Sequence, residues 1–301
     1  MEARREEDYT LRQRICRKIC NTFNRQLPDK LYLKLLYRVR MNQKLDLKNP
    51  KTFDEKLNWL KLYDRCPEYT MMADKYEVRE YIKEKIGEEY LIPLLGVWDR
   101  VEDIDYDNLP DQFVLKCTHD SGSVIICKDK GTFDITSAND KLNKVLSTNY
   151  FYPSREWPYK NIKPRIVAEQ YMVDESGTEL KDYKIYNFSG KPYLIQVDYG
   201  RFTKHERNLY DLGWNYIPEE IEYPTNPDHK IDKPQNLNLM LELAGKLSQG
   251  IPSVRTDFYN INGKVYFGEI TFYQEAGFAR FSSDRFALEL GKQIQLNSKY
   301  S

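Results

Sequence analysis

The chain has 301 residues, enough for one large or two medium domains. Its 46 basic residues balance 46 acidic ones, so the overall charge gives no reason to expect nucleic acid as a partner. Five cysteines without metal-ligand spacing and only three histidines argue against a disulfide framework and a histidine-based zinc site. No long apolar run and no signal segment occurs, and we therefore expect a cytoplasmic protein.

Residues 1–48 are predicted to form a basic, helical N-terminal arm that is interrupted near Pro28. Residues 1–46 contain 12 Lys/Arg and 6 Asp/Glu, and the basic residues alternate with Leu, Ile and Tyr. This pattern suits peripheral contact with the inner face of an anionic membrane. A solvated helix that packs on its own domain is the simpler interpretation.

Residues 49–110 are predicted to be mainly helical and to precede the main domain. Two helices and one extended segment are expected, at 52–64, 69–85 and 93–97. Thr52 can cap the first helix, with Glu55 completing a capping box. Gly87 can end the second helix.

From Phe113 onward the apolar period changes from about 3.6 residues to about 2. The predicted strands are 113–117, 123–128, 165–172, 181–188, 192–199, 254–260 and 264–273, and the predicted helices are 135–148, 235–249 and 284–296. Strand pairs with interspersed helices indicate an α+β fold with antiparallel sheets. We assign this domain to 111–301, with subdomains at 111–165 and 166–301.

The last two predicted strands meet at Asn262-Gly263, a strong hairpin signal. A two-residue turn would place Asp257 opposite Gly268 and turn Glu269 to the other face of the sheet. A three-residue loop with a bulge at Gly263 would instead bring four polar residues to one face: Arg255, Asp257, Glu269 and Thr271. We favour the bulge, because acids in half-buried strands need a cation or a donor. A solvated surface hairpin is the alternative.

Three other segments could contribute to a binding site. Lys116 ends a strand before a small polar turn, and such a turn can hold phosphate oxygens, although it is not a Walker A loop. Glu169 lies near the end of an apolar strand that could border an adenine pocket. A loop expected after residue 198 carries basic side chains that could bind a carboxylate or phosphate: Arg201, Lys204, His205 and Arg207. Taken singly, the first segment is better explained as an ordinary turn and the second as a core strand, and the basic segment is equally well explained as a solvated loop.

In this order, the hairpin of Lys116, the strand of Glu169 and the hairpin of Asp257 and Glu269 resemble an ATP-grasp enzyme. Longer motifs are similar to the TupA-like ATP-grasp family, which is linked to teichuronopeptide and other bacterial surface polysaccharides. These motifs are NPKTFDEKLNWLKLYD at 49–64, PYKNIKPR at 158–165 and FGEITFY at 267–273. The resemblance extends from about Asp29 to near the C-terminus. It implies that ATP binds between two α+β subdomains.

The resemblance also implies a role for each site residue. The ATP phosphates would be held by Lys75, Lys116 and a flexible loop of Ser121, Gly122 and Ser123. The adenine hinge would be Glu169, Gln170, Tyr171 and Met172, with Asp182 reaching the ribose. Mg²⁺ would be bound by Asp257 and Glu269, and Arg255 would stabilise the transferring phosphoryl group. Thr271 stands where amide-forming members usually carry Asn, so it is our third candidate ligand.

We therefore expect an ATP- and Mg²⁺-dependent carboxylate–amine ligase of bacterial capsule or cell-wall polysaccharide biosynthesis. A hexuronic acid would be converted to an acyl phosphate, from which the amine of an amino acid would displace phosphate. Arg201, Lys204, His205 and Arg207 would face these substrates. The alternatives are a sugar kinase or glycosyltransferase-associated enzyme of the same pathway, and a non-catalytic scaffold.

Overall fold

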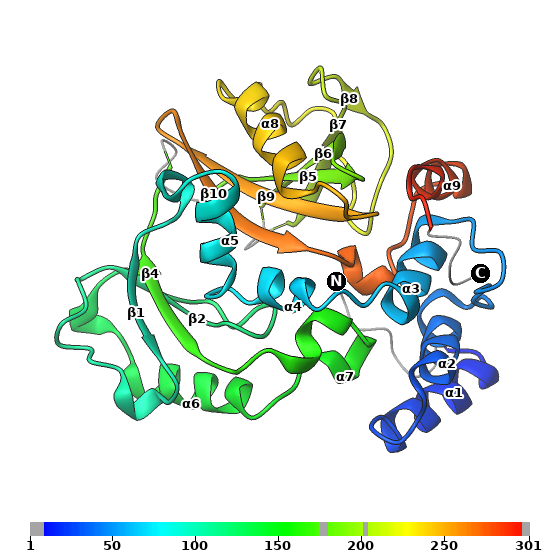
Figure 1. Cartoon of the computed structure of the whole chain (residues 1–301), viewed down its shortest axis with the longest axis horizontal. Coiled ribbons are helices and arrows are strands. Elements are labelled where there is room, and N and C mark those ends of the chain that lie inside the picture. The colour runs from blue at the N-terminus through cyan, green and yellow to red at the C-terminus, as the bar shows by residue number, and fades with distance from the viewer. Residues whose placement is uncertain (1–8, 175–179, 201–203, 297–301) are drawn as a thin grey trace.

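The computed structural model describes residues 9–174, 180–200 and 204–296. The chain begins with helices that lie at one end of the molecule (Figure 1). These are α1 (Leu11–Thr22), α2 (Asp29–Met41) and α3 (Phe53–Tyr63). The predicted capping box of α3 is confirmed, because the Thr52 hydroxyl accepts from the Glu55 amide and the Glu55 carboxylate accepts from the Thr52 amide.

The single helix predicted over 69–85 is wrong, because the structure has two helices there. They are α4 (Glu68–Ala73) and α5 (Val78–Lys85). The carboxylate of Asp74 accepts hydrogen bonds from the amides of Tyr76 and Glu77, at 2.8 and 3.2 Å, and these bonds close a turn in place of helical continuation. Lys75, inside this turn, donates its amide to the carbonyl of Thr118, 3.2 Å away. The interruption therefore brings Lys75 to the four-stranded sheet.

A four-stranded antiparallel sheet has the order β1-β4-β2-β3. Its strands are β1 (Leu94–Trp98), β2 (Phe113–Cys117), β3 (Ile125–Cys127) and β4 (Ile166–Gln170). Helix α6 (Ile135–Leu146) packs on β2 and covers the outer face. Helix α7 (Phe151–Ser154) follows α6, and short 3₁₀ turns occur at Glu88–Tyr90, Val101–Asp103, Lys130–Thr132 and Trp157–Asn161.

A six-stranded antiparallel sheet has the order β10-β9-β5-β6-β7-β8. Its strands are β5 (Asp182–Phe188), β6 (Lys191–Tyr199), β7 (Glu206–Tyr210), β8 (Tyr216–Ile217), β9 (Val254–Ile261) and β10 (Lys264–Thr271). Helix α8 (Leu237–Leu247) packs on β5, β6 and β9 and buries their apolar face. The predicted α+β fold with antiparallel sheets is confirmed.

The chain ends with a 3₁₀ turn, η6 (Gln274–Gly277), and with α9 (Asp284–Gln293), which packs on α3. Strand β1 lies before residue 111 and β4 after residue 165, yet both belong to the smaller sheet. The predicted divisions at 110/111 and 165/166 therefore do not coincide with the sheet boundaries. The two sheets lie on either side of α4 and α5 (Figure 1).

Candidate functional site

The β9–β10 hairpin has a two-residue turn, so the bulge predicted at Gly263 is wrong. Ile261 pairs with Lys264, and Asn262 and Gly263 both adopt positive φ, at 50° and 77°. The register shifts instead at Gly268, between the Phe267 and Glu269 pairs. A side chain there would place its Cβ 3.0 Å from the carbonyl oxygen of Asp257, so glycine allows this close approach.

The consequence expected of a bulge nevertheless holds. Beyond Gly268, Glu269 pairs with Asp257 and Thr271 pairs with Arg255. The four polar side chains therefore share one face of the six-stranded sheet. The other face carries Phe258 and Ile270, which are buried in the core.

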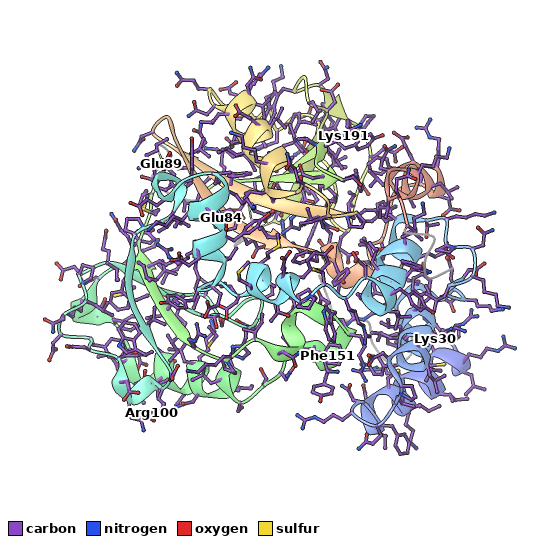
Figure 2. The ribbon with its side chains drawn as sticks, viewed as in Figure 1. Lys30, Glu84, Glu89, Arg100, Phe151 and Lys191 are labelled. Carbon is purple, nitrogen blue, oxygen red and sulfur yellow. The ribbon has the colours of Figure 1, made fainter. Side chains whose placement is uncertain are left out.

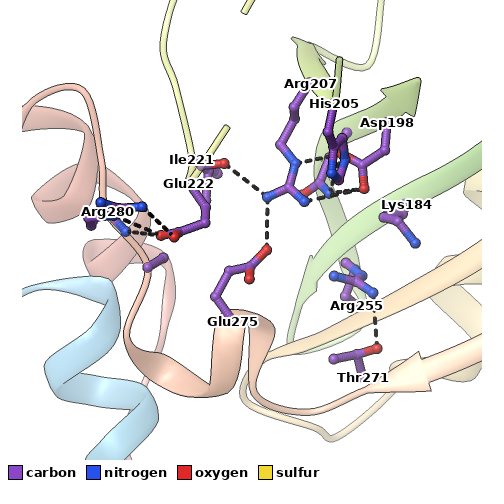
Figure 3. A network of polar contacts seen from close by, with 12 residues as sticks. Lys184, Asp198, His205, Arg207, Ile221, Glu222, Arg255, Thr271, Glu275 and Arg280 are labelled. Carbon is purple, nitrogen blue, oxygen red and sulfur yellow. Dashed lines mark hydrogen bonds and ion pairs between the residues drawn. The ribbon is translucent and has the colours of Figure 1, made fainter. Parts of the chain in front are cut away.

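Arg255 links the acids of this face. Its Nε and Nη2 donate to the two carboxylate oxygens of Asp257 at 2.7 and 2.8 Å. Nη2 also donates to Glu269 Oε1 at 3.1 Å. The same nitrogen donates to the hydroxyl of Thr271 at 3.2 Å (Figure 3). The bidentate contact between Arg255 and Asp257 fixes the orientation of the carboxylate.

Lys184 lies opposite Asp257 on β5 and was not among the residues predicted for the site. Its Nζ is 2.6 Å from Asp257 Oδ2 and 3.2 Å from Asp182 Oδ2, and all three side chains are buried. Burial lowers the pKa of Lys184, but Asp182 and Asp257 outweigh it and the pKa lies above its ordinary value. The alternation of Asp182, Lys184 and Tyr186 along the strand was the available signal, since it places all three on one face.

A cavity of about 780 Å³ lies between the two sheets, and Asp257 and Glu269 of this polar face line it together with Lys184, whereas Arg255 is not among the lining residues. Most of the predicted nucleotide and metal residues line it: Lys75, Lys116, Ser121, Gly122, Glu169, Gln170, Tyr171, Met172, Asp182, Asp257 and Glu269. Apolar side chains including Ile92, Val114 and Ile126 line another part. The volume and the mixed lining suit a nucleotide-sized ligand.

The two predicted phosphate lysines have definite partners. Lys75 Nζ donates to the carbonyl of Cys117 at 3.1 Å and to the carbonyl of Asp120, and burial lowers its pKa. Lys116 Nζ lies 2.6 Å from Glu169 Oε2 across the β2–β4 pair. Both ammonium groups are thereby held at the same cavity wall.

Ser123 does not line the cavity, unlike its neighbours Ser121 and Gly122. It is buried, and its hydroxyl donates to Asp120 at 2.6 Å and accepts from the amide of Cys117 at 2.8 Å. Ser123 therefore shapes the turn between β2 and β3 from within.

The basic segment expected to be a loop after residue 198 includes strand β7, and in this the prediction was wrong. Arg201 lies outside the described residues. Lys204 pairs with Glu206 at 2.7 Å, and the ring of His205 stacks on Tyr223.

Arg207 is buried within β7 rather than free to bind substrate. It contacts Asp198 at 2.6 Å and Glu275 at 2.9 Å (Figure 3). Every residue of β7 is buried, so the strand does not alternate between exposed polar and buried apolar side chains. It therefore could not be recognised from the sequence pattern. Neither Arg207 nor its neighbours Lys204 and His205 are among the residues that line the cavity.

The donor set at Asp257 and Glu269 fits Mg²⁺. No group of three or more Cys, His, Asp or Glu side chains that could hold a metal occurs in residues 9–174, 180–200 and 204–296. Magnesium, however, is commonly held by one or two carboxylates together with substrate phosphates. Burial raises the pKa of Glu269, but Lys184, Arg255 and Lys75 outweigh it, and the net pKa lies below its ordinary value. Glu269 is therefore charged at neutral pH and presents its carboxylate at the cavity wall.

Thr271 is a weaker candidate for a metal ligand than Asp257 and Glu269. Its hydroxyl donates to Glu269 Oε1 at 3.1 Å while it accepts from Arg255. The residue is not among those that line the cavity. Its contacts orient Glu269 in this arrangement.

Comparisons with known proteins give a clear family match. The sequence model of the family described as TupA-like ATPgrasp matches residues 55–295. No curated protein matches significantly. Among solved structures, D-alanine–D-alanine ligase from Bacillus anthracis complexed with ATP is 17% identical, with 67% of this chain and 54% of that chain covered and a TM-score of 0.38.

Two further solved structures are similar at the same level. D-Alanine-D-alanine ligase from Helicobacter pylori is 14% identical over 80% of this chain and 69% of that chain, with a TM-score of 0.41. N5-Carboxyaminoimidazole synthetase from Staphylococcus aureus complexed with ADP is 14% identical over 82% and 51%, with a TM-score of 0.38. The chain thus spans about half the length of the first and third of these structures.

Proposed function

The chain belongs to the TupA-like ATP-grasp family, whose model matches residues 55–295, and on this basis we propose that it is an ATP- and Mg²⁺-dependent carboxylate–amine ligase. The superfamily consists of ATP-dependent ligases. We propose bacterial capsule or cell-wall polysaccharide biosynthesis as its pathway, with a hexuronic acid as the carboxylate and an amino acid as the amine. The pathway and substrates rest on the family resemblance.

One observation supports the chemistry best. Three lysines and two paired carboxylates line a single cavity: Lys75, Lys116, Lys184, Asp257 and Glu269. Lysines provide point charges for phosphates, and paired carboxylates provide the hard oxygen ligands that magnesium prefers. An apolar region beside the predicted hinge, from Glu169 to Met172, can accept adenine.

In the first step, a carboxylate oxygen of the acceptor attacks the γ-phosphorus of ATP. A P–O bond forms, the bond to the β-phosphate oxygen breaks, and ADP leaves. Lys75, Lys116 and Lys184 bind and orient the phosphates, while Arg255 stabilises the charge of the transferring group. Magnesium held by Asp257 and Glu269 would neutralise phosphate charge.

In the second step, the amine attacks the acyl carbon. A C–N bond forms, the C–O bond to phosphate breaks, and phosphate leaves as the amine loses a proton. The cavity wall must exclude water, because water would hydrolyse the acyl phosphate. Arg207 is proposed to hold the carboxylates of Asp198 and Glu275 in place. Lys204 and His205, which do not line the nucleotide cavity, are proposed contacts for the acceptor.

The test is ADP release with Mg²⁺ across a panel of uronic acids in the presence of hydroxylamine. An acyl phosphate would be trapped as a hydroxamate of defined mass. We expect hydroxamate with one or a few acids, and loss of turnover by orders of magnitude in Asp257→Asn and Glu269→Gln. Asp228→Asn, an exposed acid away from the cavity, is the matched control and should be unchanged.

The outcomes separate the alternatives. A stable phosphorylated sugar without hydroxamate would identify a kinase. Absence of ATP binding to the wild-type protein would refute the nucleotide site. If Asp257→Asn and Glu269→Gln both keep wild-type turnover, the two acids are not the metal ligands of the reaction.

A further inference from the structure

Helix α1 presents an apolar stripe to solvent. Leu11 and Ile15 are 74% and 52% exposed, and the helical spacing i, i+4 places them on one face. Phe23, at the C-terminal end of the helix, is 50% exposed. Gln13 and Cys20 lie on the opposite face and are buried, and Gln13 Nε2 donates to the carbonyl of Val39 in α2 at 3.0 Å. The outward face is therefore not the face that holds α1 on the protein.

Between Tyr9 and Pro28, where the structure describes the chain, the formal charges are of one sign. Residues 9–28 contain no Asp or Glu, and their basic residues are Arg12, Arg14, Arg17, Lys18 and Arg25. On a helical projection, Arg12 and Lys18 flank the stripe on its two sides, and both are exposed. An apolar stripe bordered by basic side chains is the pattern of helices that lie in the surface of an anionic bilayer.

The position of α1 leaves this face accessible. Helices α1 and α2 lie at one end of the molecule, far from the four-stranded sheet at the other end (Figure 1). In Figure 2, Lys30 marks the end with these helices, and Arg100 marks the opposite one. The family match begins at residue 55, and no residue of α1 lines the nucleotide cavity. The helix therefore has no evident part in the proposed chemistry.

We propose that the outward face of α1, formed by Leu11 and Ile15 with Arg12 and Lys18 on either side and Phe23 at the end of the helix, docks on an anionic lipid bilayer. The helix lies parallel to the surface, its apolar side chains enter the boundary between headgroups and acyl chains, and its cations contact lipid phosphates. In the described part of the chain no helix is long and apolar enough to cross a membrane.

The apolar side chains decide between a bilayer and a nucleic acid. A basic helix alone would suit either polyanion, because both attract cations electrostatically. Burying Leu11 and Ile15 against acyl chains removes apolar surface from water, whereas a phosphate backbone offers them no such environment. The charge and the apolar stripe together favour lipid. This inference does not depend on the proposed ligase activity.

The test is co-sedimentation of the full chain with vesicles of phosphatidylcholine alone or mixed with phosphatidylglycerol. We expect binding to the mixed vesicles that weakens as salt is raised, and little binding to phosphatidylcholine alone. The double variant Arg12→Gln/Lys18→Gln should bind about 25-fold more weakly, because each basic residue near the bilayer surface contributes about five-fold to the affinity. Leu11→Gln/Ile15→Gln should weaken it at least about ten-fold.

Matched controls come from α9, which carries an exposed leucine and an exposed lysine. Leu288→Gln and Lys292→Gln should leave vesicle binding unchanged. Circular dichroism checks that each variant is folded. Hydrogen exchange of the wild type provides a test without substitutions, since vesicles containing phosphatidylglycerol should protect residues 11–22 selectively.

Several results would overturn the proposal. These are equal binding to both vesicle types, full binding by Leu11→Gln/Ile15→Gln, or protection that omits α1. Retention of the chain on duplex RNA, without any vesicle binding, would assign the basic face to nucleic acid instead.

Discussion

Replacing Lys184 by methionine should destabilise the protein because it removes one of the cations that hold Asp257 in the sheet. The two groups are 2.6 Å apart, with side chains 8% and 2% exposed. A hydrogen bond to a buried charged group contributes about 1.5–3 kcal/mol. Leaving a buried charge without any partner costs about 3–5 kcal/mol, but Asp257 keeps both bonds from Arg255. We therefore expect the free energy of unfolding to fall by about 1.5–3 kcal/mol.

A double-mutant cycle isolates this contact. Lys184→Met, Asp257→Asn and the double variant are unfolded in urea, without nucleotide or metal, and followed by tryptophan fluorescence. The coupling free energy should exceed about 1 kcal/mol, because the two side chains are in direct contact. Lys191→Met, on an exposed position of β6, is the matched control and should lie within about 0.5 kcal/mol of the wild type.

The refuting result is a small coupling. A value below about 0.5 kcal/mol would mean that Lys184 does not contact Asp257 in solution. An intact coupling with unchanged ATP affinity in Lys184→Met would instead limit Lys184 to a structural role. The two measurements thus separate the ion pair from its proposed contact with phosphate.

Three further outcomes follow from the site. Gly268→Val should lower the rate of ADP release about 100-fold or more, because a side chain there meets the β9 backbone and displaces Glu269; unchanged turnover would show that the bulge does not set the register. The lowered pKa of Glu269 contributes stability that is present above its unfolded pKa and is lost as pH falls through the folded value. Lys184→Met removes one of the cations that lower this pKa, so Glu269 should take up its proton at higher pH. The acid limb of the kcat/KM profile should therefore move to higher pH. Arg207→Met should lower the free energy of unfolding in urea by about 1.5–3 kcal/mol, because it removes the main cation of buried Asp198, which keeps its hydrogen bonds from Gln196, and adding Asp198→Asn should recover part of that loss.

Sequence periodicity was sufficient where one period ran through a whole element. The helices at 135–148, 235–249 and 284–296 and the capping box at Thr52 all appear in the structure. The requirement that Asp257 and Glu269 share a face was also correct, because it followed from the cost of burying a charge. These inferences used local geometry or a general energetic rule.

The register of the hairpin could not be obtained in the same way. One extra residue was needed in the hairpin to bring Asp257 and Glu269 to the same face, but either Gly263 or Gly268 could supply it. The turn at Asn262-Gly263 accommodates two residues with positive φ, which leaves the bulge to Gly268. An isolated glycine inside a strand is itself a bulge signal, and greater weight on it would have found the position.

Other misses arose where tertiary contacts override the local pattern. Lys75 lies in a stretch of good helical periodicity, and the turn there is stabilised by contacts with Cys117, at the end of β2, and with Thr118, which follows that strand. Strand β7 contains charged residues on a buried face, since Arg207 is matched by Asp198 across the β6–β7 pair. A single sequence does not show which distant partner will neutralise a charge.

The motif at 49–64 contributed to the resemblance, yet none of its residues lines the nucleotide cavity. Its helix instead holds the backbone that follows β10. Asn58 donates to the carbonyl of Gly277 at 2.6 Å, and Lys61 donates to that of Ala276 at 2.5 Å. Glu275, Ala276 and Gly277 all adopt positive φ, a costly conformation for the first two that the surrounding structure must support. This segment follows β10, the strand of Glu269, after Phe272 and Tyr273, so we expect the motif to act on the site by fixing the chain just beyond the end of that strand.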